Sequence, residues 1–286
     1  MKTYLECLPC VMRQALEGAR HVAADSAIAE EALRRAAHAV SAANLDVSSP
    51  VLIGTVHQMI RELLGEDDPY KAAKEICNRN ALNLYPELKR IVETSAQPLE
   101  TAIRIAIAGN TIDFVVDPNA DQSDLMRVVE QALEAPLSKE TVTAFAQAVE
   151  RAHSILYVGD NAGEIVFDRL LIEQLPAYKI TYVVRGRPVI NDVTMLDAQA
   201  TGVSDVVEVI SSGSDLPGTV LSRCSEEFRI RFSHTDLIIS KGQGNFESLD
   251  ETGKETFFLF KAKCVVMQLH VGCRIGELMF LHKRSA

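Results

Sequence analysis

Three segments of the sequence place oxygen ligands or basic groups directly after an apolar run. In the first, ILYVGDNAGEIVFD, an aliphatic run passes through Gly159 into Asp160 and Asn161. Adjacent carboxylate and amide oxygens are hard ligands that suit Mg²⁺ or Mn²⁺ better than zinc. Gly159 permits a sharp turn, and a helix that begins near Gly163 and Glu164 offers its backbone amides to an anion. A simple helix N-cap at Asp160 is the competing explanation.

The second segment, ITYVVRGRPVINDVTMLDA, ends an apolar run at Val184 and reaches Asp192 through a loop that contains glycine and proline. A carboxylate at the end of a neighbouring strand completes a metal site that one loop alone does not supply. Asp192 is therefore predicted as a second metal ligand. Arg185 and Arg187 lie in the same loop and are candidates to meet a substrate phosphate, although solvent-exposed arginines are common.

The third segment, DLIISKGQGNFESL, continues from an apolar run into Lys241, a glycine-rich turn, Asn245 and Glu247. Its glycines let the backbone approach a ligand closely, and a lysine at a strand end is a point charge for a phosphoryl oxygen. The glycine spacing differs from that of a Walker phosphate-binding loop. A plain turn with a solvent-facing lysine explains the segment in isolation. Glu164 and Glu247 are further candidates for proton transfer, with surface or capping roles as the alternative.

Cys7 and Cys10 form a CxxC pair near the start of the chain. On a helix, residues three apart share a face, so the two sulfurs are suited to a second metal ion or to a redox pair. Two thiolates supply half of a tetrahedral zinc site, and no second CxxC follows. An ordinary buried helix start explains the pair as well, and Cys264, Cys273 or a histidine is a candidate neighbour in the fold.

The elements that must position these groups follow from a change in hydrophobic periodicity near residue 154. Before it, apolar residues recur every three or four positions in segments rich in Ala, Leu, Glu and Arg, which predicts helices. After it, short apolar runs alternate with helical stretches, and this alternation predicts a mostly parallel sheet covered on both faces. The expected strands are 154–158, 179–184, 205–210, 237–240 and 256–260, and the expected helices are 162–174, 193–200 and 220–232.

We therefore predict an α/β protein with an all-helical N-terminal domain over residues 1–100 and a Rossmann-like catalytic domain over residues 101–286. In such a sheet, ligands bind beyond the carboxyl ends of the strands. The three polar segments all follow predicted strands, so they are expected to meet at one edge. Each segment alone is weak evidence for a functional site, and the expected convergence of all three is what indicates one.

Composition excludes several classes of function. The 286 residues carry a formal net charge of -10 without a stripe of Lys and Arg, which argues against a nucleic-acid partner. No apolar run approaches the roughly 18 residues of a membrane span, and the start lacks a signal-peptide pattern, so a cytoplasmic protein is expected. Six scattered cysteines read as free thiols in a reducing compartment. The oligomeric state is not indicated.

Taken together, these segments resemble the damage-control phosphatase family, also known as domain of unknown function 89. The N-terminal YLECLPC resembles the CxxC-bearing prokaryotic branch of that family. The resemblance spans nearly the whole chain. The motifs that carry it are GDNAGE at 159–164, GRPVIND at 186–192, KGQGNFE at 241–247 and RIAIAGNTID at 104–113.

The resemblance implies a helical domain joined to a three-layer α/β/α domain. It also implies a divalent metal, with Mg²⁺, Mn²⁺, Co²⁺ and Ni²⁺ all plausible, held by Asp160, Asn161 and Asp192. The implied reaction is hydrolysis of phosphomonoesters of small metabolites, such as sugar phosphates or damaged phosphometabolites, with Asn110 and Lys241 at phosphate positions. The predicted catalytic residues are Asp160, Asp192 and Lys241, and the predicted substrate contacts are Asn110, Gly163, Glu164, Arg187 and Asn245.

Two other functions remain open at this stage. One is a non-catalytic sensor of a phosphorylated ligand, although paired carboxylates repel an anion unless a metal intervenes. The other is an S-adenosylmethionine-dependent carboxyl methyltransferase, an activity described for a eukaryotic family member, but no GxGxG-type loop follows the first strand. The sequence does not decide whether water or Asp160 attacks the phosphorus.

Overall fold

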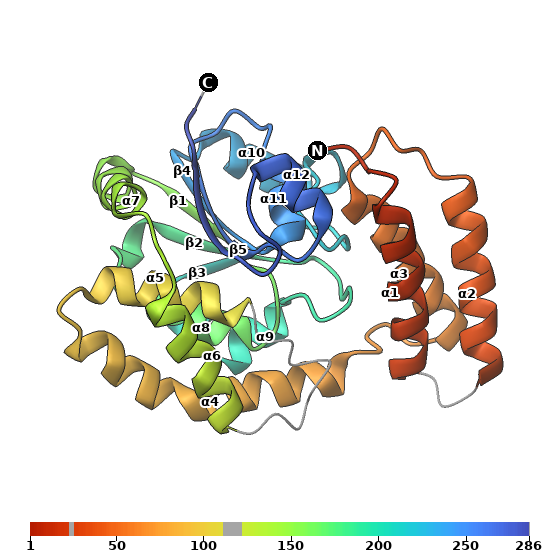
Figure 1. Ribbon diagram of the computed structural model, residues 1–286, viewed down its shortest axis with the longest axis horizontal. Helices are drawn as coiled ribbons and strands as arrows, with labels where there is room; N and C mark the ends of the chain where they lie inside the picture. Colours follow the sequence, from red (N-terminus) through yellow and green to blue (C-terminus); the bar gives the residue numbers. More distant parts are fainter. Residues whose placement is uncertain (23–25, 111–121, 286) are drawn as a thin grey trace.

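The computed structural model describes residues 1–22, 26–110 and 122–285, and it shows the predicted α/β class (Figure 1). A helical N-terminal region precedes a six-stranded, mostly parallel sheet interleaved with helices. Residues 111–113 of the RIAIAGNTID motif lie outside the described residues. Within the described ranges, no helix combines the length and the apolar character that a membrane crossing requires.

Helices α1 to α3 pack into a bundle with a core of its own. Small residues such as Ala15 and Ala32 let the helices approach closely, and Val56 and Ile60 of α3 fill the centre. Pro50 lies in the first turn of α3, where its missing N–H has no intrahelical partner to lose. The helices before the sheet are α1 (Cys7–Val22), α2 (Ser26–Ser41), α3 (Ser49–Leu64), α4 (Lys71–Thr94), α5 (Pro98–Gly109), α6 (Gln122–Glu134) and α7 (Lys139–Arg151).

The sheet has the strand order β3-β2-β1-β4-β5-β6, with β6 antiparallel to β5 and all other pairs parallel. The order reverses at β1, which lies between β2 and β4, and ligands in doubly wound sheets bind at such a switch point. Val158 of β1 is level with Val183 and Ser240. The strands are β1 (Ile155–Val158), β2 (Ile180–Val184), β3 (Glu208–Ser211), β4 (Leu237–Lys241), β5 (Thr256–Lys261) and β6 (Leu278–Lys283).

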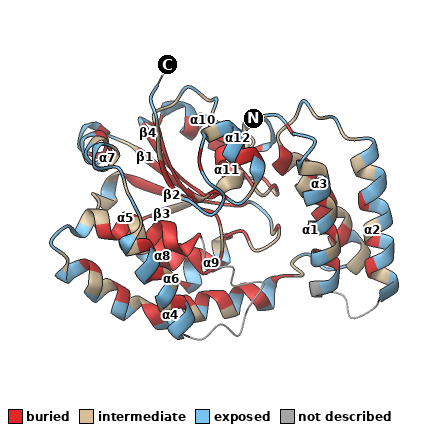
Figure 2. Ribbon diagram, viewed as in Figure 1, coloured by how far each residue is buried: buried red, intermediate tan, exposed pale blue. Residues whose placement is uncertain are grey.

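Alternate residues of each strand face opposite layers. Ile155 and Tyr157 pack in a core with α4, α5 and α8, whereas Leu156 and Val158 pack with α10, α11 and α12. Figure 2 shows that burial is concentrated in the inner strands β1, β2, β4 and β5 and in α8, whose residues are all buried except Arg169. The helices within the sheet region are α8 (Glu164–Ile172), α9 (Met195–Ala200), α10 (Glu226–His234), α11 (Gln243–Leu249) and α12 (Val265–Val271), with short 3-10 turns at Ala177–Lys179, Val203–Asp205 and Leu221–Arg223.

The structure adds to and adjusts the expected elements. Helices α11 and α12 and strand β6 were not predicted from the sequence, and α11 stands where a glycine-rich turn was expected. The expected helix at 220–232 begins later, at Glu226, because residues 221–223 form a separate turn and the Ser225 side chain caps the helix by accepting from Phe228 N. The division at residue 100 stays a prediction, and it is notable that Leu84 and Leu88 of α4 belong to the core of the sheet rather than to that of α1 to α3.

Candidate active site

Two loops that follow neighbouring strands are joined by backbone hydrogen bonds. Asn161, after β1, and Asp192, after β2, form an isolated antiparallel bridge. Val193 N donates to Asp160 O at 2.8 Å, and Ala162 N donates to Asn191 O at 2.8 Å. The bridge therefore brings all three predicted metal ligands together, and it does so through the main chain.

Two side-chain amides hold the carboxylates of Asp160 and Glu164 side by side. Asn110 Nδ2 donates to Asp160 Oδ2 at 2.9 Å and to Glu164 Oε2 at 3.0 Å. Asn161 Nδ2 donates to the same two oxygens at 2.8 and 3.1 Å. Asn110 follows α5 directly, and its own Oδ1 accepts from Lys261 N at 3.1 Å. Asn110 thus lies beside Asp160 and Glu164, and its predicted contact with a substrate phosphate stays a prediction.

Lys241 is fully buried and contacts the Glu164 carboxylate of this group. Its ammonium donates to Glu164 Oε1 at 2.6 Å, to Ala106 O at 2.8 Å and to the Asp168 carboxylate. A lysine has three N–H donors, and all of them are used. The predicted direct contact of Lys241 with a phosphoryl oxygen is not supported by this placement. Its charge instead balances two buried carboxylates.

The Asp192 carboxylate is paired with the buried guanidinium of Arg185. Arg185 Nε donates to Asp192 Oδ2 at 2.6 Å, and the same side chain donates to Thr219 Oγ1 and to Asn245 Oδ1 at 3.0 Å each. Asn245, fully buried, also donates to Gly159 O at 3.0 Å. Arg185 and Asn245 therefore tie the loops after β1, β2 and β4 to one another, and neither side chain is open to solvent.

The remaining predicted substrate contacts have other partners or other positions. Gly163, at φ 77, is the N-cap of α8, and its N–H donates to Asn78 Oδ1 at 2.7 Å. Arg187 is exposed and lies outside the lining of the cleft in front of Asp160. The turn after β4 approaches that carboxylate closely. At Gly242, φ 80, an added Cβ would overlap the Asp160 carboxyl group.

The carboxylates at the bridge carry a surplus of buried negative charge. Burial, with the nearby charges of Glu164 and Asp192, raises the pKa of Asp160 to about 8. Burial also raises the pKa of Asp192, although the Arg185 guanidinium opposes the rise. The unfavourable charge on these buried carboxylates is removed if one of them is protonated, and it is neutralised if they bind a cation.

A cleft of about 790 Å³ lies in front of Asp160, Asn161 and Asp192. Its facing wall comes from α1 and α3, and its rim includes Lys263. Lys263 is exposed, and its charge acts against the rise in the pKa of Asp160. Lys263 was not among the predicted site residues, although it follows a predicted strand just as Lys241 does.

Cys7 and Cys10 line the same cleft, and Cys264 at the start of α12 joins them there. Burial raises the pKa of Cys7 to about 11 and also raises that of Cys10, so both thiols are protonated at neutral pH. Over residues 1–22, 26–110 and 122–285, no three His, Cys, Asp or Glu side chains are arranged to hold a metal ion. The metal site at Asp160 and Asp192 and the one at Cys7 and Cys10 both stay predictions. At the first site, the third predicted ligand is the amide oxygen of Asn161.

Comparison with known proteins gives one family. Residues 3–279 match the family described as the Damage-control phosphatase ARMT1-like domain. A damage-control phosphatase from Pyrococcus horikoshii is 32% identical over 289 residues, 99% of each chain, and one from Archaeoglobus fulgidus is 32% identical over 234 residues, 78% of this chain and 79% of that one. The crystal structure of a DUF89 family protein from Pyrococcus horikoshii matches with a TM-score of 0.90 and 31% identity, over 99% of this chain and all of the other. The chain therefore belongs to the damage-control phosphatase family that its motifs resembled.

Proposed function

We propose that the protein is a metal-dependent phosphatase that hydrolyses phosphomonoesters of small metabolites. The observation that carries the proposal is the convergence of Asp160, Asn161 and Asp192 on one wall of a cleft of about 790 Å³. A volume of that order suits a small molecule rather than a polymer. The names of the relatives, damage-control phosphatases, support the reaction type.

The chemistry of the donor set fits a divalent cation. Two carboxylates and one amide oxygen are hard ligands, as Mg²⁺ and Mn²⁺ prefer, and Co²⁺ and Ni²⁺ also accept them. Asn161 donates to its neighbours through Nδ2, which leaves its amide oxygen for a metal. The raised pKa values of Asp160 and Asp192 mark a place where a cation is favourable. When bound, the metal supplies a Lewis acid that polarises the phosphoryl group.

The residues of the chain hold this set in place and meet the substrate. Lys241 and Asn110 fix the Glu164 carboxylate, and Arg185 orients Asp192. Lys263 and Arg20 are exposed basic side chains that line the cleft, whereas the ammonium of Lys241 is fully engaged. The charge of Lys263 acts on Asp160, which places it near the predicted metal ligands. We assign the role of phosphate contact to Lys263 and that of positioning to Lys241.

The test is phosphate release from a panel of sugar phosphates with Mg²⁺, Mn²⁺, Co²⁺ or Ni²⁺, with and without EDTA. Asp160→Asn and Asp192→Asn are each expected to lower kcat/KM at least about 100-fold, because each removes a direct ligand. Asp67→Asn, on the exposed loop after α3, is the control and is expected to match wild type. Circular dichroism checks that all three variants fold.

The opposite outcomes identify the competing functions. Full metal-dependent activity in both site variants would reject the assignment of the ligands. Phosphate release that is negligible with every metal favours a sensor, whereas release that is indifferent to EDTA rejects the metal dependence of the proposed phosphatase. Binding of S-adenosylmethionine by calorimetry favours the methyltransferase.

A further inference from the structure

His57 of α3 is a buried polar side chain without a hydrogen-bond partner. It is 3% exposed, and neither of its ring nitrogens makes a hydrogen bond to any residue that the structure describes. Leaving a buried donor or acceptor unpaired costs about 1–3 kcal/mol, so such groups are rare in folded proteins. The cost points to a role for the imidazole other than stability.

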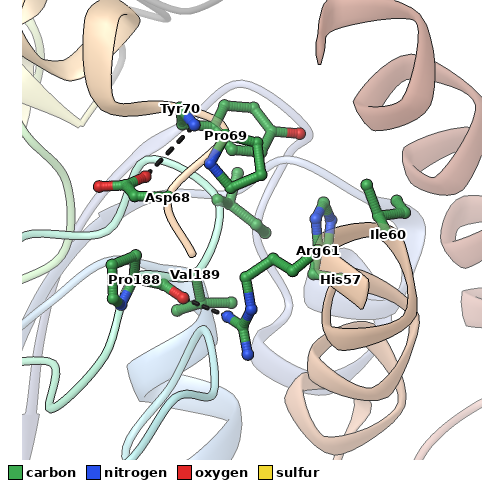
Figure 3. A pocket seen from close by; sticks show the side chains of 9 residues that line it. His57, Ile60, Arg61, Asp68, Pro69, Tyr70, Pro188 and Val189 are labelled. Carbon is green, nitrogen blue, oxygen red and sulfur yellow. Dashed lines mark hydrogen bonds between the residues drawn. The ribbon is translucent and has the colours of Figure 1, made fainter. Parts of the chain in front are cut away.

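His57 lies where the helical bundle meets the loop that carries Asp192. It lines the main cleft together with Asp160 and Asp192, and it also lines a hollow of about 10 Å³ beside residues 188–190 (Figure 3). One turn further along α3, Arg61 donates to Pro188 O and, at 3.0 Å, to Asp215 Oδ2. His57 is therefore part of the wall that faces the predicted metal ligands.

A second unfavourable feature lies at the same place. Ile190 has a φ of 46°, the one positive φ outside glycine among the described residues. A β-branched residue in this region is an outlier, and such strain costs about 1–3 kcal/mol. Ile190 lines the cleft and precedes Asn191 and Asp192 directly. Strain next to a binding surface is typical of sites that are shaped for a ligand.

The imidazole is neutral at physiological pH. Burial, assisted by the charge of Arg61, lowers the pKa of His57 to about 4. A neutral imidazole offers one N–H donor and one nitrogen acceptor, whereas an anion needs donors or positive charge. A hydroxyl group, which also donates and accepts, can use both properties. Lys263, by contrast, suits the phosphate.

We propose that His57 is a specificity-determining residue that hydrogen-bonds a hydroxyl group on the non-phosphate part of the substrate. The preferred substrates are then phosphomonoesters of hydroxylated compounds, such as sugars and polyols, and the inference rests on the proposed phosphatase function. In the structure, α1 covers the ring: a Cβ on Gly18 would lie 3.2 Å from His57 Cε1. Both ring nitrogens are buried, so α1 or residues 188–190 must move aside before a substrate contacts them.

The kinetic test compares a hexose phosphate with phenyl phosphate, which has no hydroxyl group outside its phosphate. His57→Phe is expected to lower kcat/KM for the hexose phosphate about 10-fold, mainly through KM, which corresponds to about 1.4 kcal/mol. The same variant is expected to stay within about twofold of wild type on phenyl phosphate. His57→Gln, which keeps a donor and an acceptor, should recover part of the loss. Gln58→Ala, on the exposed face of the same helix and outside the lining of the cleft, is the control.

The thermal stability of His57→Phe is the second readout. Replacing an unpaired polar ring by an apolar ring of similar shape is neutral or stabilising, so Tm should stay the same or rise. A lower Tm, or equal losses on both substrates, would mean that His57 has only a structural role. If wild type hydrolyses neither substrate, the phosphatase proposal fails by itself, and calorimetric binding of the hexose phosphate to wild type and His57→Phe still decides the role of His57.

Discussion

At the scale of single residues, the two lysines that follow β4 and β5 have opposite environments. Lys241 is fully buried between Glu164 and Asp168, whereas Lys263 is exposed at the rim of the cleft. A buried cation that is paired on two sides neutralises the charge of its partners, and removing it leaves that charge uncompensated. An exposed lysine is free to reorient toward an incoming anion.

These environments predict different effects of substitution. Lys241→Met is expected to destabilise the protein by about 3–5 kcal/mol, because two buried carboxylates lose their counterion. Lys263→Ala is expected to leave the unfolding free energy nearly unchanged and to raise KM about 10-fold, as the loss of a charged hydrogen bond to phosphate would. Urea unfolding and steady-state kinetics measure the two effects. The reverse pattern would restore Lys241 as the phosphate contact.

The sequence predicted the site residues through their position after strands, and it did not predict their partners. Asp160, Asn161 and Asp192 follow apolar runs, so their convergence could be anticipated. The burial of Lys241 depends on carboxylates that α8 supplies one turn apart, and no local pattern reveals that pairing. The unpaired state of His57 likewise has no sequence signal, because an apolar helix face with one histidine is ordinary.

At the scale of elements, the turn between β4 and α11 packs against the Asp160 carboxylate. Gly242 adopts φ 80 and ψ 155, a region that is nearly exclusive to glycine. Its Cα is also so close to the Asp160 carboxylate that any side chain would overlap it. The glycine is therefore needed for its backbone shape and for the space it leaves.

A pair of glycine variants separates these two needs from the general cost of a positive φ. Gly272 ends α12 at φ 77, with nothing within 4 Å of an added Cβ. Gly272→Ala is expected to cost about 1–2 kcal/mol and to keep full activity. Gly242→Ala should cost more and reduce kcat/KM at least about 10-fold, because Asp160 must move. Equal activity in the two variants, measured with saturating metal, would show that Asp160 tolerates displacement.

The elements themselves could be predicted where hydrophobic runs were bounded by clear turns. Five of the strands lie where the sequence placed them, within a few residues. The segment after β5 was missed because a short apolar run such as residues 265–271 fits a helix or a buried strand equally well. Strand β6 joins the sheet edge in the antiparallel direction, which no alternation of strand and helix predicts.

At the scale of the whole molecule, the buried charge at the site links stability to pH. The pKa of Asp160 is about 8 in the folded protein and 3.8 as its ordinary value. A carboxyl group with a raised pKa stabilises the fold below its ordinary pKa, and that contribution is lost as pH rises through the folded value. The slope is about 1.4 kcal/mol per pH unit for one proton. Asp168, at about 6, and His57, at about 4, titrate mostly below pH 6.5.

Between pH 6.5 and 8, the Tm of protein treated with EDTA is therefore expected to fall. Excess Mn²⁺ or Mg²⁺ should abolish the fall, because a cation takes over the role of the proton on Asp160. Asp160→Asn should flatten the EDTA profile without metal. Differential scanning fluorimetry across this range gives all three curves. Identical wild-type profiles with and without metal would argue against a cation at Asp160.

The hydrophobic cores show how the two walls of the cleft are built. The wall with the predicted metal ligands rests on the cores of the sheet, whereas the facing wall belongs to α1 and α3, which share a separate core with α2. The sequence predicted a helical region in front of a catalytic one. It did not reveal that α4 packs with the sheet, because an amphipathic helix does not identify its partner.

The separate core of α1 to α3 has a consequence for how such a protein diversifies. Changes in the cleft-facing positions of α1 and α3, such as Val11, Gln14 and Ile53, alter the shape presented to a substrate while leaving the bridge between Asn161 and Asp192 intact. Selection can then retune which metabolite is accepted without rebuilding the reaction centre. The residues that shape the substrate side of the cleft can therefore change independently of the residues that form the reaction centre.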